Sequence, residues 1–143
     1  MKVSQNWLKT LVDINSTPED LSEKLSIGGF EVESLVDCSK NVCGVVLGKI
    51  ISVSKHERSE KLSICYVDVG NSKNLQIICG AQNIKPNIYV YVATIGAKLD
   101  AINLTIKRSE IRGVMSEGMI CSLQELGIED SSDGIAIIDE NLA

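Results

Sequence analysis

The stretch KHERSEKLSICYVDVG, residues 55–70, joins a charged loop to an apolar strand. Lys, Arg and Glu occupy five of its first seven positions, and His56 lies among them. From Leu62 onward the residues are mostly β-branched, apolar or aromatic, which favours a strand that ends at Gly70. Such a strand would hold the charged loop at a fixed place on a sheet.

Four further stretches carry the same strand-forming residue types. They are GVVLGKIISVSK (44–55), LQIICG (75–80), NIYVYVATIG (87–96) and AINLTIKRSEIRG (101–113). The two glycines of GVVLGK are expected to permit a bend or a close backbone approach. Five short strands within about 80 residues favour a small closed sheet, and we expect a five-stranded β-barrel of the oligonucleotide-binding (OB) type.

The first 39 residues predict helices instead. Ser4 precedes apolar residues at helical spacing, and TPED (17–20) supplies an N-cap and an N-terminal proline for a second helix, which Gly28 and Gly29 end. FEVESLV (30–36) then alternates apolar and polar residues as a half-exposed strand does. The fold class is therefore α+β, with the barrel inserted into or following a small helical α/β lead segment.

After the strands, the sequence predicts a short helical turn near residues 122–126 and a last strand over 134–138. This divides the chain into three segments. We expect a lead segment at 1–39, a barrel at 40–130, and a last segment at 131–143 that contains the final strand.

Charge follows the same three zones. The net charge is −5, but residues 1–39 carry −4, residues 40–112 carry +6 and residues 113–143 carry −7. Attraction of an anionic partner depends on the field within about 10 Å of the surface, so the basic middle matters more than the total. No apolar run reaches membrane-spanning length, the N-terminus lacks signal-peptide features, and we expect a cytoplasmic protein.

The five cysteines are odd in number and form no C-x-x-C pair, which argues against a disulfide framework and against a zinc site. They are Cys38, Cys43, Cys65, Cys79 and Cys121. We expect them to be small buried apolar side chains.

Catalytic chemistry has little support in these residues. His56 is the only histidine, and no glycine-rich phosphate loop is present. Two pairs of adjacent carboxylates, Glu129-Asp130 and Asp139-Glu140, lie in acidic turns where they are expected to be solvated. We expect no catalytic residue and no metal site in this segment. His56 has two interpretations, a partly exposed residue at a strand end or a contact to a phosphate or base.

Binding is better supported than catalysis. Cations gather at two places, with Lys55, Arg58 and Lys61 in the first loop and Lys107, Arg108 and Arg112 late in the barrel. Tyr89 and Tyr91 are two residues apart, so both rings face one side of a strand. The cations either contact nucleic acid or are ordinary solvated surface, and the tyrosines either stack on bases or pack beneath the N-terminal helices.

Several stretches together resemble a known family. HERSEKLSICYVDVG (56–70), LQIICGAQNI (75–84), VATIGAKL (92–99) and IKRSEIRGVMSEGMICSLQELGI (106–128) resemble the tRNA-binding domain at the start of the bacterial-type phenylalanine–tRNA ligase beta subunit. The opening, MKVSQNWLKTLVDI with TPEDLSEKLSIGGFEVES, is similar to that subunit's own N-terminus. One departure concerns the first loop, where the family usually has His-Pro-x-Ala-Asp-Lys-Leu and this chain has no proline, which leaves the loop less pre-ordered.

The resemblance implies a non-catalytic tRNA-binding and scaffolding segment. It implies tRNA contacts by Lys55, His56, Arg58, Lys61, Tyr89, Tyr91, Lys107, Arg108 and Arg112. In that family an alpha subunit uses ATP and magnesium to attach phenylalanine to tRNA, the enzyme has two alpha and two beta subunits, and beta continues for several hundred residues, so we expect a fragment. This segment itself is expected to need no cofactor.

Two alternatives remain open from the sequence. The chain could be a purely structural module that touches no RNA, or a free-standing tRNA-binding or chaperone-like OB-fold protein. Related free-standing domains share the barrel motifs and lack the helical lead, which favours the ligase subunit.

Overall fold

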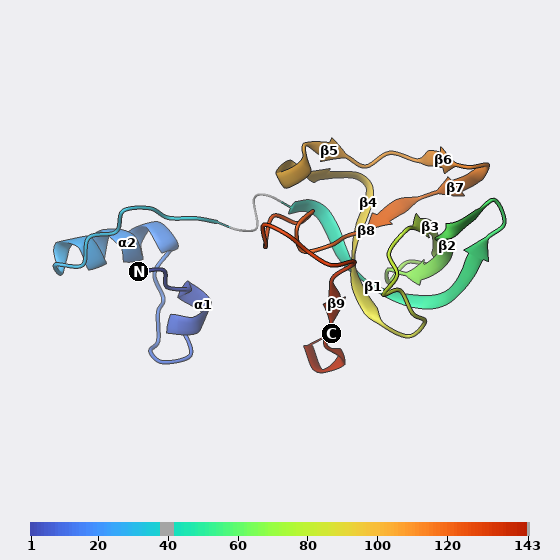
Figure 1. Ribbon diagram of the computed structural model, residues 1–143. Coiled ribbons are helices and arrows are strands. Elements are labelled where there is room, and N and C mark those ends of the chain that lie inside the picture. The colour runs from blue at the N-terminus through green and yellow to red at the C-terminus, as the bar shows by residue number, and fades with distance from the viewer. Residues whose placement is uncertain (38–41, 143) are drawn as a thin grey trace. The chain divides into compact units, whose positions relative to one another are not determined.

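A computed structural model describes residues 1–37 and 42–142 of the chain. The chain divides into two compact units, residues 1–37 and residues 38–143, and each is described by itself (Figure 1). Cys38 lies outside the described residues. Within the described part, no helix is long and apolar enough to span a membrane.

The first unit contains two helices whose starts follow the sequence. Helix α1 (Gln5–Leu8) begins after Ser4, whose side chain accepts a hydrogen bond from the Trp7 N–H. Helix α2 (Pro18–Ile27) begins after Thr17, which accepts from the Asp20 N–H, and ends at Gly28. The predicted cap at Thr17 is confirmed, and Ser4 caps α1 in the same way, because side-chain oxygens satisfy donors that the first turn leaves unpaired.

The prediction of a strand over residues 30–36 is wrong. Residues 30–37 form neither helix nor strand. An alternating pattern gives a strand only where a second strand supplies hydrogen-bond partners, and the described part of this unit has only helices. No residue of α1 or α2 is buried, and Trp7, Ile27 and Phe30 are among the exposed apolar side chains.

The second unit is mostly β, with a curled antiparallel sheet (Figure 1). Strands β1 (Val42–His56), β2 (Ser59–Asp68), β3 (Leu75–Cys79) and β4 (Tyr89–Leu99) confirm four of the predicted strands. Their order in the sheet is β3-β2-β1-β4, and β1 pairs with both of its neighbours. The register sets Ile50 opposite Val67 and Val46 opposite Val92.

The stretch 101–113 is not one strand. It holds the 3-10 helix η2 (Asp100–Ile102), strand β5 (Leu104–Thr105), which pairs with β4, and strand β6 (Ser109–Ile111). Strand β6 forms a separate hairpin with β7 (Val114–Ser116). The prediction fails because left-handed backbone at Asn103 and at the pair Arg112-Gly113 turns the chain where the residue types alone indicated extension.

The C-terminal part adds two short strands to β4. They are β8 (Gly118–Ile120) and β9 (Ile137–Ile138), so the predicted last strand is present but shorter. Between them Ser122 and Glu125 form reciprocal side-chain caps on a hydrogen-bonded turn, as predicted near residues 122–126. A 3-10 helix, η3 (Glu140–Leu142), follows β9.

Residues 115–117 close the free edge of β3. The Ser116 hydroxyl accepts from the Ile78 N–H at 3.1 Å, and the Gln76 side chain donates to the Met115 carbonyl at 2.8 Å. The Glu117 N–H donates to the Gln76 carbonyl at 2.8 Å. Residues 115–117 therefore have a structural role, because they satisfy polar groups that an open sheet edge would expose.

The core lies inside the curl of the sheet. One buried cluster includes Ile50, Val67, Ile77 and Val92, and a second includes Leu99, Ile106 and Leu126. The two glycines of GVVLGK allow this packing, since a Cβ at Gly48 would lie 2.6 Å from Val92 Cγ2 and one at Gly44 would lie 2.9 Å from Ala97 Cα. The predicted close approach is confirmed.

Three of the predicted buried cysteines are buried. Cys65, Cys79 and Cys121 are free thiols in the core, and burial raises the pKa of Cys65 and of Cys121 to about 12. The prediction is wrong for Cys43, which is exposed. Cys43 pairs with the exposed Lys98, so the alternation of β1 directs it outward while its neighbour Val42 lies opposite the buried Leu99.

Candidate nucleic-acid interface

Two tight hairpin turns, far apart in the sequence, lie on the same side of the second unit (Figure 1). The β1–β2 turn contains only Glu57 and Arg58, because His56 pairs with Ser59. The β6–β7 turn contains only Arg112 and Gly113, because Ile111 pairs with Val114. We call these two turns the paired tips, and each presents one arginine.

The β6–β7 tip has the backbone of a tight hairpin turn. Arg112 has a φ of 51° and Gly113 a φ of 87°. Positive φ at both central residues is typical of a two-residue turn whose twist matches that of the flanking strands. Glycine adopts this conformation readily, while arginine in it needs support from surrounding contacts.

His56 lies between the tips and is 4% exposed. Its Nδ1 accepts from the Arg58 N–H at 3.0 Å, and its Nε2 lies 3.2 Å from the Ile111 carbonyl oxygen. The expectation of a partly exposed side chain is therefore wrong. The residue does end strand β1, but its ring is directed inward and presents almost no surface to a ligand.

The two arginines are in direct contact through the backbone. The Arg112 guanidinium donates to the Arg58 carbonyl oxygen at 3.2 Å. Arg58 Nη1 in turn lies over Gly113, 3.0 Å from where a Cβ would stand. Both arginines are exposed, and one hydrogen bond leaves Arg112 with four further N–H donors. The paired tips thus hold two guanidinium groups on short, fixed turns.

Lys55 and Lys61 flank the β1–β2 tip and are both exposed. Lys55 pairs with Ser63, and the register between Lys55 and His56 shifts, which places Lys61 in a bulge of β2. Exposed Glu57 lies in the turn and exposed Glu60 lies next to it in β2, so the local positive charge is smaller than the number of cations indicates.

Arg108 differs from the two tip arginines because a carboxylate pairs with it. Its guanidinium donates to Glu117, and Lys73 Nζ lies 3.9 Å from the same carboxylate. The hydrogen bond from the Gln76 N–H lowers the pKa of Glu117 below its ordinary value, and Arg108 and Lys73 lower it further. Lys107 is exposed on the segment between β5 and β6.

The tyrosines lie apart from the tips on strand β4. They are half-buried on the face opposite the core residues Val90 and Val92. Lys49 Nζ lies 5.2 Å from the centre of the Tyr89 ring, and Tyr91 packs against the second core cluster. Lys49 is seven residues before His56 on β1, so the structure separates these rings from the paired tips.

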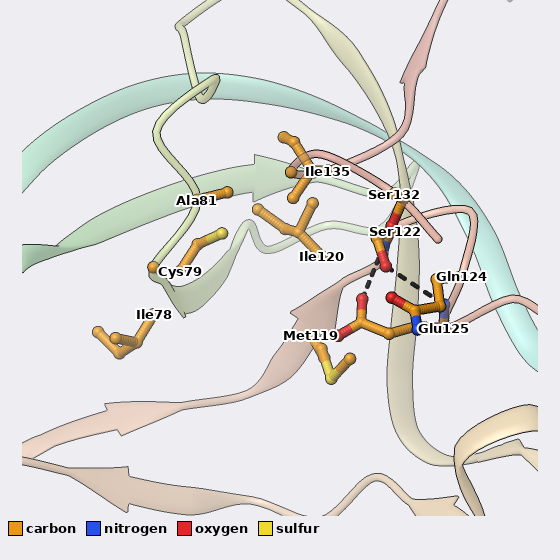
Figure 2. A pocket seen from close by; sticks show the side chains of 12 residues that line it. Ile78, Cys79, Ala81, Met119, Ile120, Ser122, Gln124, Glu125, Ser132 and Ile135 are labelled. Atoms are coloured by element: carbon orange, nitrogen blue, oxygen red, sulfur yellow. Dashed lines mark hydrogen bonds between the residues drawn. The ribbon is translucent and has the colours of Figure 1, made fainter. Parts of the chain in front are cut away.

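A hollow of about 390 Å³ lies elsewhere in the unit and contains none of the predicted site residues (Figure 2). Its lining includes Cys79, Met119, Ile120, Glu125 and Ile135. Figure 2 shows the Glu125 carboxylate turned to Ser122, from whose N–H it accepts at 2.7 Å. The one charged side chain of this lining is thus already engaged within the protein.

Sequence patterns missed two features of this region. Glu117 was not recognised as the partner of Arg108, because the interaction depends on how the β6–β7 hairpin reaches β3. The residue types of 101–113 predict strand at the Arg112-Gly113 turn, although glycine after a strand-like run is a turn signal. Among residues 1–37 and 42–142, no group of three or more His, Cys, Asp or Glu side chains could hold a metal ion.

Fold and site together define a small antiparallel β domain that carries cationic hairpin turns on a rigid sheet. The family model described as a putative tRNA binding domain matches residues 45–143. The chain belongs to this family.

Named relatives agree with the family match. The phenylalanine–tRNA ligase beta subunit of Prochlorococcus marinus (strain MIT 9312) is 82% identical over 143 residues, which is 100% of this chain and 18% of the relative. The same subunit of strain CCMP1986 of that species is 77% identical over 100% of this chain and 17% of the relative. The subunit of Synechococcus sp. (strain CC9605) is 54% identical over 98% of this chain and 17% of the relative. The resemblance inferred from sequence is confirmed, and the chain spans less than a fifth of the length of these relatives.

Proposed function

We propose that this chain is the tRNA-contacting and scaffolding segment of a phenylalanine–tRNA ligase beta subunit, with no catalytic residue of its own. It supports the ATP-dependent attachment of phenylalanine to tRNA in the cytoplasm. The observation that carries the proposal is the pair of exposed arginines on interlocked turns, in a chain of the tRNA-binding family.

The paired tips suit a phosphate backbone for a physical reason. Guanidinium groups donate two parallel hydrogen bonds to a phosphate, and a charge-assisted bond is about twice as strong as a neutral one. Ordering a free side chain costs about 0.5–1.5 kcal/mol at an interface, and turns already fixed by hydrogen bonds reduce that cost. Arg58 and Arg112 are therefore the principal contacts, and Lys55 and Lys61 extend the surface.

The other predicted residues have smaller parts in this proposal. Lys107 adds to the positive field, Arg108 is largely neutralised by Glu117, and Tyr89 and Tyr91 would meet only a tRNA segment that extends beyond the tips. Sequence-specific reading of bases is not expected, because single phosphate contacts position a nucleic acid without identifying its sequence.

The proposed domain plan places an OB-type five-stranded barrel at 40–130. Residues 1–39 are the first part of a split α/β domain, and 131–143 lead back to it. The exposed apolar residues of the helical unit support this plan, since helices with no buried residue need another surface to pack against.

The whole ligase would comprise this beta subunit and an alpha subunit, two of each. ATP and magnesium belong to the catalytic part of that assembly. The described residues include no cluster of metal ligands, so no step of the chemistry is assigned to them.

A salt titration of tRNA binding tests the proposal. Fluorescence anisotropy with a phenylalanine tRNA transcript should give a slope of about −3 in log affinity against log salt, as expected for roughly four phosphate contacts. Reversing the charge of Lys55, Arg58 and Lys61 should abolish binding, while Lys85→Ala, an exposed cation elsewhere, should change it less than twofold.

Two outcomes would favour the alternatives. Unchanged tRNA charging by the full assembly after the charge reversal would indicate a structural module without RNA contact. Binding at full affinity by a dimer of this chain alone would indicate a free-standing tRNA-binding protein.

A further inference from the structure

The only histidine of the chain is buried; one of its ring nitrogens faces the backbone of the β1–β2 tip, and the other faces the last residue of β6, directly before the β6–β7 tip. We propose that His56 is a positioning residue that couples the two arginine-bearing tips and so sets the geometry in which Arg58 and Arg112 meet a phosphate. This inference rests on the proposed function for its ligand, while the coupling itself is a property of the free protein.

The hydrogen-bond partners fix the protonation state of the imidazole. The Arg58 N–H can only donate, so Nδ1 must be the unprotonated acceptor. The Ile111 carbonyl can only accept, so Nε2 carries the proton and donates. The neutral Nε2–H tautomer is therefore the one form of the ring that makes both bonds, since an imidazolium would set an N–H against the Arg58 N–H.

The two bonds have different consequences. The Nδ1 bond closes the β1–β2 turn on itself, because Arg58 is only two residues from His56. The Nε2 bond joins this turn to β6, at the residue just before Arg112 in the sequence and 55 positions away from His56. With the bond from Arg112 to the Arg58 carbonyl, it forms a second link between the same two turns.

Burial makes these links strong. A buried polar group that loses its partner is costly to leave unpaired, so separating the turns while the imidazole stays in place is unfavourable. The β1–β2 turn lacks the proline that would fix its backbone, and His56 supplies that restraint from inside.

The test uses the full 143-residue chain and four variants, His56→Ala, His56→Asn, His56→Gln and Arg112→Ala. Asparagine can accept from the Arg58 N–H in place of Nδ1, and glutamine can donate to the Ile111 carbonyl in place of Nε2. We expect His56→Ala to weaken binding of a phenylalanine tRNA transcript about tenfold. Asparagine and glutamine should each recover part of that loss.

A multiple variant distinguishes positioning from a general loss of stability. If His56 acts through the tips, adding His56→Ala to a chain that carries both Arg58→Ala and Arg112→Ala should weaken binding less than twofold further, because both arginines that it positions are already gone. A full additional tenfold loss would overturn the inference, as would wild-type affinity in His56→Ala. Thermal unfolding of each variant establishes that it is folded. If the His56→Ala variant does not fold, the same comparison is made with His56→Asn and His56→Gln.

A measurement without RNA separates this inference from the proposed function. Long-range ¹⁵N–¹H spectra should show the Nε2–H tautomer, and His56→Gln and His56→Asn should shift the amide resonances of Arg112 and Gly113. The Nδ1–H tautomer, or unchanged amides at the second tip, would overturn the coupling. If the wild-type chain binds no tRNA while its spectra show the expected tautomer and coupling, the proposed function is overturned and the coupling by His56 still holds.

Discussion

Arg112 and Arg108 belong to the same cationic stretch of sequence and have opposite surroundings. Arg112 donates to a neutral backbone carbonyl and keeps its charge available on an exposed turn. Arg108 donates to the Glu117 carboxylate, which also attracts Lys73. The difference shows that a count of cations does not define a binding surface, because the nearest carboxylate decides how much charge remains for a ligand.

The same comparison explains two roles for one hairpin. Its tip, Arg112-Gly113, meets the β1–β2 turn, while its base, from Ser116 to Glu117, closes the edge of β3. The tip is suited to binding and the base to stability. Substitutions at the two ends should therefore separate affinity from the free energy of unfolding.

The largest contrast should come from Arg112→Ala against Arg108→Ala. Arg112→Ala should weaken tRNA binding about tenfold, since a hydrogen bond to a charged group contributes about 1.5 kcal/mol or more. Its salt slope should become shallower by about 0.7, the value for one phosphate. Arg108→Ala should change affinity less than twofold. Anisotropy titrations at two salt concentrations measure both, and equal losses would contradict the comparison.

Glu117→Gln, at the base of the hairpin, should lower stability and raise affinity for tRNA. The amide keeps an oxygen for the Gln76 N–H but loses the charge that pairs with Arg108 and Lys73. We expect a loss of about 1 kcal/mol in the free energy of unfolding, limited by the exposure of both cations. Affinity for tRNA should rise about twofold as Arg108 is released. Urea unfolding and anisotropy measure the two effects, and weaker binding would contradict this role.

The pH dependence of stability offers a further test of Glu117. Its pKa is lowered in the folded protein, so its contribution is complete above the ordinary value of 4.5 and disappears as the pH falls through the lowered pKa. Wild type and Glu117→Gln should therefore differ in stability at pH 7 and converge below pH 4.5. Urea unfolding from pH 7 to pH 3 measures this, and a constant difference across that range would exclude the carboxylate as its source.

The sequence was most informative where the signal is local. The cap at Thr17 and four of the strands follow from side chains and residue types within a few positions of each other. The strand prediction for residues 30–36 is wrong because the alternating pattern is a local signal. A strand also requires a partner strand, which the described lead segment does not contain. The prediction of a single strand over 101–113 is wrong because the backbone turns at Asn103 and Arg112, although the residue types in between favour a strand.

The sequence predicts which residue types form the candidate site, but it does not predict which of these residues are in contact. Clusters around Arg58 and Arg112 were visible in the sequence, but their contact spans 54 positions and depends on the curl of the sheet. The inward direction of His56 could not be read from its neighbours, all of them charged or polar. Long-range pairing decides such positions, and a single sequence carries no direct signal of it.

A smaller loss of affinity than that of Arg112→Ala is expected at Gly113, and it tests how closely the tips must fit. Gly113→Ala places a methyl group about 3.0 Å from Arg58 Nη1, and the φ of 87° disfavours alanine. Because the end of an arginine side chain can move, the main penalty is backbone strain of about 1–2 kcal/mol. Moving the Arg58 guanidinium from its place should weaken tRNA binding about threefold.

Gly70→Ala is the matched control for this substitution. Gly70 has a similar φ of 79°, but a Cβ there would meet no atom within 4 Å. Both variants should therefore lose similar stability in urea, while only Gly113→Ala should lose affinity. If the two bind tRNA equally well, the position of Arg58 over Gly113 does not matter for binding, and the paired tips contribute charge without a defined geometry.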